Sequence, residues 1–258
     1  MKIKSFLLKI KPIKYYAIGK KFLNNVEYID TRKKSLGEME KSPTRTEIIN
    51  FLLSLKQKDT CYLEIGVRRP EVNFNHIKAS VKYSVDPFVD IDKPIHFKMT
   101  SDAFFLKLSN NEILSKEVKF DLIFIDGLHL AHQVDKDIEN ALNYINEDGF
   151  VVLHDCNPPT EWHARESQIF PFTPARKVWN GTTWKAFLKW RFNPLLYSCC
   201  IDSDFGVGIL SKNKLLGNNI KQINPFFEFS SLDSNREEYL NLIDFDTLKS
   251  KLISKDEE

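Results

Sequence analysis

The alternation of apolar and polar positions predicts helices and strands in turn from residue 44 onward. Thr44 and Glu47 form a capping-box signature, which predicts that a helix begins there. The apolar residues that follow recur at helical spacing, at Ile48, Phe51, Leu52 and Leu55. Three strands are then expected, the third of them weaker, over 61–67, 82–87 and 96–99.

The middle of the chain gives the clearest pattern. Residues 120–127 form a continuous apolar run, as expected of a strand that is covered on both faces of a parallel sheet. An amphipathic helix around 134–145 follows, the pair Asp148-Gly149 breaks it, and another buried strand is expected over 150–155. Strand, helix and strand in this order predict a parallel βαβ unit.

Two further strands are predicted near the end of the chain, over 197–201 and 205–210. Only three residues connect them, so they must form an antiparallel hairpin. The chain therefore predicts a Rossmann-like, doubly wound α/β fold in three layers, α/β/α. We divide it into a basic N-terminal arm (1–43), the main domain (44–212), and a C-terminal extension of helices and loops (213–258) that packs on the same domain.

Composition narrows the class of protein. Hydrophobic residues make up 42% of the 258 residues and the formal net charge is +2, which argues against disorder and against a nucleic-acid partner. The four cysteines (Cys61, Cys156, Cys199 and Cys200) form no C-x-x-C pair. Such a pattern is typical of reduced thiols in a cytoplasmic protein. No apolar run reaches the roughly 18–20 residues that cross a bilayer.

The N-terminal arm mixes lysines with apolar residues and has neither the apolar core nor the cleavage site of a secretory signal. Two interpretations remain open. The arm either makes a weak peripheral contact with anionic lipid at the inner membrane surface, or docks on its own domain as an ordinary surface element. It is also a candidate for a homodimer contact.

Acidic residues follow the predicted strands. Ligands of an open parallel sheet bind outside the carboxyl ends of its strands, and these ends carry Glu64 and Gly66, Asp86, Asp126, and the pair His154-Asp155. This arrangement favours a cationic or hydroxyl-rich ligand, or a metal. Asp86 follows Glu64-x-Gly66 at the spacing of a nucleotide fingerprint, in which the later acid binds ribose. Without further glycines to hold a pyrophosphate, S-adenosylmethionine fits better than a dinucleotide.

Several of these segments together resemble the class I S-adenosylmethionine-dependent methyltransferases. They are Leu63-Glu-Ile-Gly-Val67, Ser84-Val-Asp-Pro87, Met99-Thr-Ser-Asp102, Phe120-Asp-Leu-Ile-Phe-Ile-Asp-Gly-Leu-His129 and Leu153-His-Asp-Cys-Asn-Pro158. The resemblance covers about 47–210, and is greatest to a small bacterial group that often sits among surface-polysaccharide and antibiotic-sugar genes. One departure is that the family's glycine-rich first loop is reduced to Gly66, followed by Arg69-Pro70.

The resemblance implies a seven-stranded sheet with an antiparallel last strand, and a set of cofactor contacts. It places Glu64 and Gly66 beside the methionine moiety, Asp86 on the ribose and Asp102 near the adenine amino group. Ser101 and Asp126 are further cofactor-binding candidates.

A metal and a base are expected at the last two parallel strands. Related sugar O-methyltransferases hold magnesium with an Asp-Gly pair and an acidic pair, and this chain has Asp126-Gly127 and His154-Asp155 at these positions. We expect Asp126 and Asp155 to bind Mg²⁺ or Mn²⁺, and His154, or His129 in its place, to accept the hydroxyl proton. Alternatively, Asp126 contacts only the cofactor, Asp155 bonds the turn at 157–159, and His129 caps a helix.

Residues 158–190 contain four tryptophans with nearby basic residues, and this segment forms part of the acceptor lid in the fold that the resemblance implies. The tryptophans either bind a glycosyl acceptor bearing phosphate or carboxylate, or belong to the core. The function predicted is O-methylation of a sugar or another small hydroxyl acceptor in bacterial surface-glycan biosynthesis. Two alternatives are a non-catalytic S-adenosylmethionine-binding scaffold and a metal-dependent oxygenase or hydrolase on the same fold.

Overall fold

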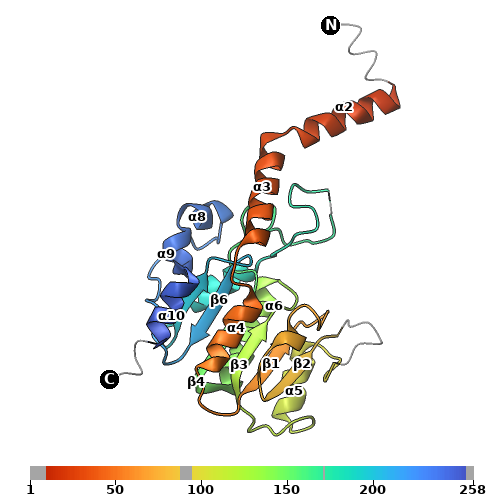
Figure 1. Ribbon diagram of the computed structural model, residues 1–258. Helices are drawn as coiled ribbons and strands as arrows, with labels where there is room; N and C mark the ends of the chain where they lie inside the picture. The colour runs from red at the N-terminus through yellow and green to blue at the C-terminus, as the bar shows by residue number, and fades with distance from the viewer. Residues whose placement is uncertain (1–9, 88–94, 171, 254–258) are drawn as a thin grey trace.

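A computed structural model describes residues 10–87, 95–170 and 172–253 (Figure 1). The helices are α2 (Lys11–Leu23), α3 (Val26–Glu40), α4 (Arg45–Ser54), the short 3-10 helix η1 (Phe74–His76), α5 (Ser101–Ser109), α6 (Ala131–Tyr144), α7 (Thr183–Trp190), α8 (Phe229–Ser234), α9 (Arg236–Leu240) and α10 (Phe245–Ile253). The strands are β1 (Cys61–Ile65), β2 (Val81–Val85), β3 (Phe120–Ile125), β4 (Ile145–Leu153), β5 (Tyr197–Ile201), β6 (Val207–Ser211) and β7 (Leu242–Ile243).

All seven strands form one sheet in the order β2-β1-β3-β4-β6-β5-β7. β2, β1, β3 and β4 are parallel, whereas β6 is antiparallel to both of its neighbours, β4 and β5. The predicted α/β class and its mostly parallel seven-stranded sheet with an antiparallel strand are confirmed. The antiparallel strand is β6, and the two-residue β7 that follows it in the chain pairs parallel with β5.

The strand expected over 96–99 is wrong. That segment makes only an isolated parallel bridge, in which Phe97 pairs with Val85. Seven strands are nevertheless present because β7 is added at the opposite edge of the sheet. The break expected at Asp148-Gly149 also differs, since both residues lie inside β4, which begins directly after α6 at Ile145. The pairing of β4 with β3 shifts register near this point.

Strand alternation divides the core into two layers. Tyr62, Phe124 and Val152 face one side of the sheet, where they pack with buried residues of α4 and α10. Ile65 and Leu153 face the other side, where buried residues of α5, α6 and α7 cover the sheet. Both faces are therefore covered, which explains why β3 is buried along its whole length.

The parallel strands end together at one edge. In the register of the sheet Ile65 pairs with Val85 and with Ile125, and Ile125 pairs with Leu153. The residues that directly follow the ends of these four strands are Gly66 (β1), Asp86 (β2), Asp126 (β3) and His154 (β4). The convergence of acidic groups that the sequence predicts therefore exists, at the carboxyl edge of β2, β1, β3 and β4.

Two helices, α2 and α3, precede α4 and the sheet along the chain. α3 buries Tyr28, Thr31 and Ser35, whereas α2 buries none of its residues. In Figure 1, α3 stands at one end of the body and α2 continues away from it. Residues 1–9 of the predicted arm lie outside the described residues. Among the described helices, none combines the length and the apolar character that spanning a bilayer requires.

Candidate active site

Strand geometry brings Asp126 and His154 to the same face of the sheet. Asp126 comes two residues after Phe124 and His154 two residues after Val152, so both continue the face that α4 covers. Strict alternation would direct Asp155 to the opposite face. Asp155 instead has a left-handed φ of 63°, and its carboxylate lies 3.2 Å from Nδ1 of His154. The left-handed backbone at Asp155 therefore brings the side chains of His154 and Asp155 to the same side of the sheet.

His129 completes this cluster from the turn between β3 and α6. Its Nδ1 lies 2.8 Å from Oδ2 of Asp155, and its Nε2 lies 3.2 Å from Oδ1 of Asp126. Nδ1 of His154 lies 3.4 Å from the same oxygen of Asp126. The structure thus brings together four of the residues that the sequence indicated for catalysis and metal binding. We call Asp126, His129, His154 and Asp155 the histidine–aspartate cluster.

Two residues that the sequence analysis missed border the cluster. Arg45, the first residue of α4, pairs with Asp204 at 3.1 Å and lies 3.9 Å from Asp126. Asp204, in the connection between β5 and β6, also lies 3.2 Å from Nε2 of His154. Nη1 of Arg45 lies 3.1 Å from the same Nε2, so Asp204 and Arg45 together contact the ring nitrogen of His154 that points away from Asp126 and Asp155. The only sequence signal was the acidic character of the short hairpin connection.

The loop before α7 holds the opposite side of the cluster. The Trp179 ring stacks on the His129 imidazole, with centroids 5.2 Å apart and planes 10° apart. Asn180 donates to Oδ1 of Asp155 at 2.7 Å. Gly181 has a φ of 63°, and a Cβ there would lie 2.1 Å from the His129 carbonyl oxygen. Only glycine allows the loop to approach His129 so closely.

Opposite charges dominate the ionisation of the cluster. Burial alone would lower the pKa of both histidines, but Asp155 and Asp126 outweigh it and raise the pKa of His129 to about 10 and that of His154 well above its usual value. Burial also opposes ionisation of Asp126 and Asp155, yet the histidines hold the pKa of both carboxyls below the usual range. Without a bound cation, the histidines are therefore charged and balance the carboxylates.

The cluster fits a divalent cation. One possible ligand atom from each of Asp126, His154 and Asp155 lies within 4.8 Å of the others. Nδ1 of His129 and Nδ1 of His154 are buried and have no hydrogen-bond partner among the described residues, although carboxylate oxygens lie close by. Contacts of this kind are expected of donors that surround an ion, whose neighbouring ligands stand roughly 3.0–3.4 Å apart. His154 is therefore a candidate ligand as well as the predicted base.

A second acidic position lies at the end of β1. Glu64 is buried, and one carboxylate oxygen accepts hydrogen bonds from the Tyr62 hydroxyl at 2.7 Å and from Asn73 at 2.9 Å. Burial raises the pKa of Glu64 to about 7, despite these two hydrogen bonds. Because both partners are neutral, the carboxylate keeps an unmet preference for positive charge. The methionine end of S-adenosylmethionine carries a sulfonium, an ammonium and a carboxylate, and either of its two cationic groups fits this requirement.

The backbone beside Glu64 is equally specific. Gly66 has a φ of 89°, and a Cβ there would lie 2.1 Å from the Asp126 carbonyl oxygen. This single glycine therefore lets the ends of β1 and β3 approach each other. Asp86 accepts a hydrogen bond from the Arg68 amide at 2.7 Å, so its carboxylate faces the loop that follows Gly66. Glu64, Gly66 and Asp86 occupy the strand ends that the sequence predicted for the cofactor.

Ser101 and Asp102 lie elsewhere. Gln133 of α6 donates to Ser101 at 3.2 Å and to Asp102 at 2.8 Å, and Lys136 lies 3.4 Å from the Asp102 carboxylate. Both residues are thus held at the contact between α5 and α6, and within the described part of the chain neither forms a hydrogen bond or ion pair with the histidine–aspartate cluster. Their predicted contact with the cofactor stays a prediction.

The tryptophans of the 158–190 segment were expected either to bind the acceptor or to belong to the core, and they differ in their surroundings. Trp184 is fully buried in the core, Trp179 stacks on His129, and Trp162 donates to Glu27 of α3. Arg165 donates to backbone carbonyls, and Arg176 donates to the Tyr28 hydroxyl. These two arginines have protein partners, so the structure does not favour them as ligands of an acidic acceptor.

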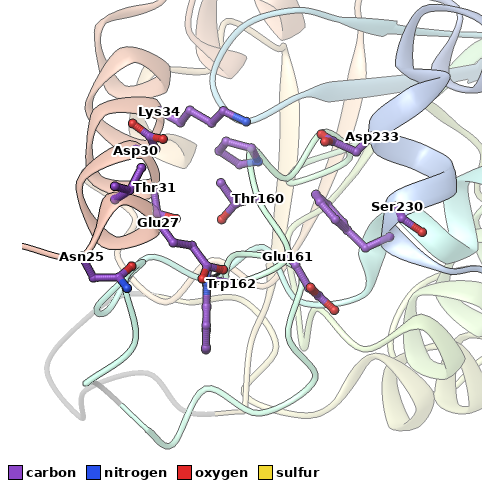
Figure 2. Close-up of a pocket in the computed structure, with 13 residues that line it drawn as sticks. Asn25, Glu27, Asp30, Thr31, Lys34, Thr160, Glu161, Trp162, Ser230 and Asp233 are labelled. Carbon is purple, nitrogen blue, oxygen red and sulfur yellow. Dashed lines mark hydrogen bonds between the residues drawn. The ribbon is translucent and has the colours of Figure 1, made fainter. Parts of the chain in front are cut away.

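A cavity of about 670 Å³ lies between α3, the segment after β4, and α8 (Figure 2). Its charged lining is mostly acidic, with Lys34 the one basic residue among four carboxylates: Glu27, Asp30, Glu161 and Asp233. Trp162 and Thr160 also line it. The cavity begins four residues after Asp155, along the segment that leaves the end of β4.

Comparison with known proteins identifies the central part of the chain. Residues 74–156, about a third of the sequence, match the family model described as "Methyltransferase domain". The match includes Asp86, Asp126, His154 and Asp155. No curated protein matches the sequence.

Solved methyltransferase structures are similar at low identity. An O-methyltransferase from Bacillus cereus in complex with SAH is 13% identical, with a TM-score of 0.42 over 76% of this chain and 97% of that chain. A putative caffeoyl-CoA O-methyltransferase from Staphylococcus aureus is 15% identical, with a TM-score of 0.44 over 78% and 99%. MycE methyltransferase from the mycinamycin biosynthetic pathway, in complex with Mg, SAH and mycinamycin VI, is 14% identical, with a TM-score of 0.41 over 70% and 51%.

The family match over residues 74–156 agrees with the predicted resemblance to methyltransferases. Neither the scaffold nor the oxygenase or hydrolase alternative is favoured by the family match.

Proposed function

We propose that this methyltransferase transfers a methyl group from S-adenosylmethionine to a hydroxyl of a sugar or another small acceptor, in the biosynthesis of bacterial surface glycans. The observation that carries the proposal is the convergence of Asp126, His154 and Asp155 beside the β1 end. Transfer to a hydroxyl requires the oxygen to lose its proton as it attacks the methyl carbon in line with the sulfonium. A cluster of carboxylates and imidazoles at this edge suits that requirement.

Asp126, His154 and Asp155 are the residues that we assign to a divalent cation, Mg²⁺ or Mn²⁺. A bound cation would lower the pKa of the acceptor hydroxyl and orient it. The imidazole among the donors favours Mn²⁺ over Mg²⁺, because nitrogen is a poor ligand for magnesium. Asp204 orients His154 by contacting its Nε2, the ring nitrogen that does not face Asp126 and Asp155.

His129 is the residue that we assign to proton transfer. Its side chain is 18% exposed, compared with 8% for His154, so it is the more accessible of the two. Trp179 holds its ring plane by stacking. The carboxylates that raise its pKa are also the candidate ligands, so a cation and the imidazolium proton compete for the same negative charge.

The cofactor is assigned to the ends of β1 and β2. Glu64 supplies negative charge toward the methionine end, Gly66 permits close approach of the backbone, and Asp86 is placed to accept from ribose hydroxyls. In this arrangement the sulfonium lies at the ends of β1 and β3, next to Asp126. Methyl donor and acceptor oxygen are then on adjacent strand ends.

The cavity beside α3 supports a hydroxyl-rich acceptor. Carboxylates are strong acceptors of hydroxyl hydrogen bonds, and an indole face packs well on a sugar ring. The excess of Glu27, Asp30, Glu161 and Asp233 over Lys34 favours a neutral or cationic sugar over an acidic one. An acceptor that extends from this cavity toward Asp155 would follow the segment that leaves β4.

The test is methyl transfer from isotopically labelled S-adenosylmethionine to a panel of neutral, amino and acidic sugars, with products identified by mass spectrometry. We expect a mass gain of one methylene on an oxygen of neutral or amino sugars. Glu161→Gln should raise the KM for amino sugars more than the KM for neutral sugars. Methylation of nitrogen or carbon acceptors alone would contradict the proposal.

A further inference from the structure

α2 exposes apolar side chains to an unusual extent. Every residue of this helix lies at the surface or is only half-buried. The exposed apolar and aromatic residues are Ile13, Tyr15, Tyr16, Ile18, Phe22 and Leu23. Tyr16 is 71% exposed and Tyr15 is 64% exposed. Apart from a ring contact between Phe22 and Tyr28, the helix therefore gains little from its own domain.

Positive charge is concentrated on the same segment. The first 26 residues of the sequence contain seven lysines and no aspartate or glutamate, whereas the rest of the chain has more acidic than basic residues. Four of these lysines lie on α2, at Lys11, Lys14, Lys20 and Lys21, and all four are exposed. The segment thus differs in charge from the body on which it stands.

A second apolar element projects from the same end of the molecule. Ile169, Phe170 and Phe172 are 90%, 60% and 72% exposed. The base of their loop is tied to the start of α3, since Trp162 donates to Glu27 and Arg176 donates to the Tyr28 hydroxyl. In Figure 1 this loop and α2 both extend beyond the sheet on the side of α3.

We propose that α2 and the tip formed by Ile169, Phe170 and Phe172 dock this protein on the surface of an anionic phospholipid bilayer. The proposal is independent of the proposed function. Lysines near such a surface gain electrostatic attraction, while apolar and aromatic side chains enter the headgroup boundary. Docking here would also bring the loop that holds Asn180 and Trp179 close to the membrane, and with it the histidine–aspartate cluster.

The distribution of side chains favours lipid over a second copy of the chain. At 100° per residue, Ile13 and Tyr16 lie on one side of α2 and Ile18 lies on the opposite side, with Lys14 and Lys21 between them. A protein partner would be expected to bind a continuous apolar stripe. A bilayer surface accommodates a dispersed pattern, because lysine stems lie along apolar material while their ammonium groups reach the headgroups.

The test is co-sedimentation of the full chain with vesicles of phosphatidylcholine, either pure or with about 30% phosphatidylglycerol, at about 0.1 M and about 1 M salt. We expect binding to the anionic vesicles at low salt, and at least about tenfold weaker binding to pure phosphatidylcholine or at high salt. A variant with Lys11→Glu, Lys14→Glu, Lys20→Glu and Lys21→Glu should lose at least about tenfold in affinity for the anionic vesicles.

A matched variant carries the same charge change elsewhere, at four exposed lysines of the body: Lys78, Lys98, Lys116 and Lys221, each changed to Glu. It should keep most of the vesicle binding. A third variant, with Ile169→Ser, Phe170→Ser and Phe172→Ser, keeps all the charges and should also bind more weakly. Circular dichroism of each variant confirms that it is folded.

Three outcomes would overturn the proposal. They are no binding of the wild-type chain to anionic vesicles at low salt, equal losses in the α2 variant and the matched variant, and a concentration-dependent dimer that the α2 variant abolishes while vesicle binding is absent. The last result would assign α2 to an interface between two copies of the chain.

Discussion

The two halves of the candidate site differ in how their carboxylates are compensated. At the end of β1, the hydrogen-bond partners of Glu64 among the described residues are the neutral Tyr62 and Asn73, and burial raises its pKa to about 7. At the ends of β3 and β4, Asp126 and Asp155 lie among His129 and His154, which keep the pKa of both carboxyls low. In the first half no positive side chain among the described residues hydrogen-bonds to the carboxylate, whereas the second half is already balanced.

This difference indicates which ligand each half can take. A buried carboxylate with neutral partners gains from a cationic cofactor, whose charge it does not have to share with a protein side chain. A balanced cluster can accept a metal ion only if other positive charge leaves, as when histidines lose their protons. The account therefore assigns S-adenosylmethionine to the Glu64 half and a divalent cation to the histidine–aspartate cluster.

Asp155→Asn should have the largest effect on activity. Asparagine tolerates the left-handed φ of this position and can still accept from Asn180, so the fold should be kept while the negative charge is lost. We expect kcat to fall about 100- to 1000-fold. Asp246→Asn, at an exposed site on α10, is the control and should leave kcat unchanged. Near-normal turnover by the Asp155 variant would remove the cluster from catalysis.

Glu64→Gln should change the pH dependence of stability. A pKa raised from 4.5 to about 7 means that Glu64 favours the folded state below pH 4.5 and loses this contribution as pH rises through 7. At pH 8 the buried carboxylate therefore costs about 3 kcal/mol, which glutamine avoids. Urea unfolding should show that the variant gains stability relative to wild type between pH 5 and pH 8. A difference in unfolding free energy between Glu64→Gln and wild type that does not change with pH would contradict the account.

Asp204→Asn should produce an intermediate loss. The substitution weakens the contact that orients His154 and the pair with Arg45. We expect kcat to fall about 10- to 100-fold with little change in affinity for S-adenosylmethionine. Asp202→Asn, two residues earlier in the same connection, tests whether the turn alone matters, because Asp202 pairs with Lys41 instead. Equal losses in the two variants would argue against orientation of His154.

The smallest effect concerns cofactor binding and pH. A cationic ligand near Glu64 favours its ionised form, so affinity should fall as pH drops below 7. We expect S-adenosylmethionine to bind about fivefold more weakly at pH 6 than at pH 7, and S-adenosylhomocysteine, which lacks the sulfonium charge, to lose less. Calorimetry in matched buffers measures both. Identical pH profiles for the two compounds would place the sulfonium away from Glu64.

Much of this site could be predicted because strand ends are local features of the sequence. The apolar run before Asp126 and the one before His154 fix two parallel strands, and parallel strands in one register must end at the same edge. Glu64 and Asp86 follow by the same reasoning.

The residues that were missed reach the site from distant parts of the chain. Arg45 comes from the first turn of α4, and Asp204 from a hairpin connection, and nothing in the local pattern pairs them. The same holds for Gly181 and for the stacking of Trp179 on His129, because their loop meets His129 only in the folded chain. The strand expected over 96–99 was wrong because the pattern there supports one bridge at Phe97, and β7 had only two residues from which to predict it.

The most direct test of the division between the two halves is the affinity for S-adenosylmethionine, measured by calorimetry on Glu64→Gln and Asp155→Asn in parallel. The account predicts that Glu64→Gln binds the cofactor about tenfold or more weakly, and that Asp155→Asn binds it as the wild type does. Loss of cofactor binding in Asp155→Asn together with normal binding in Glu64→Gln would contradict it.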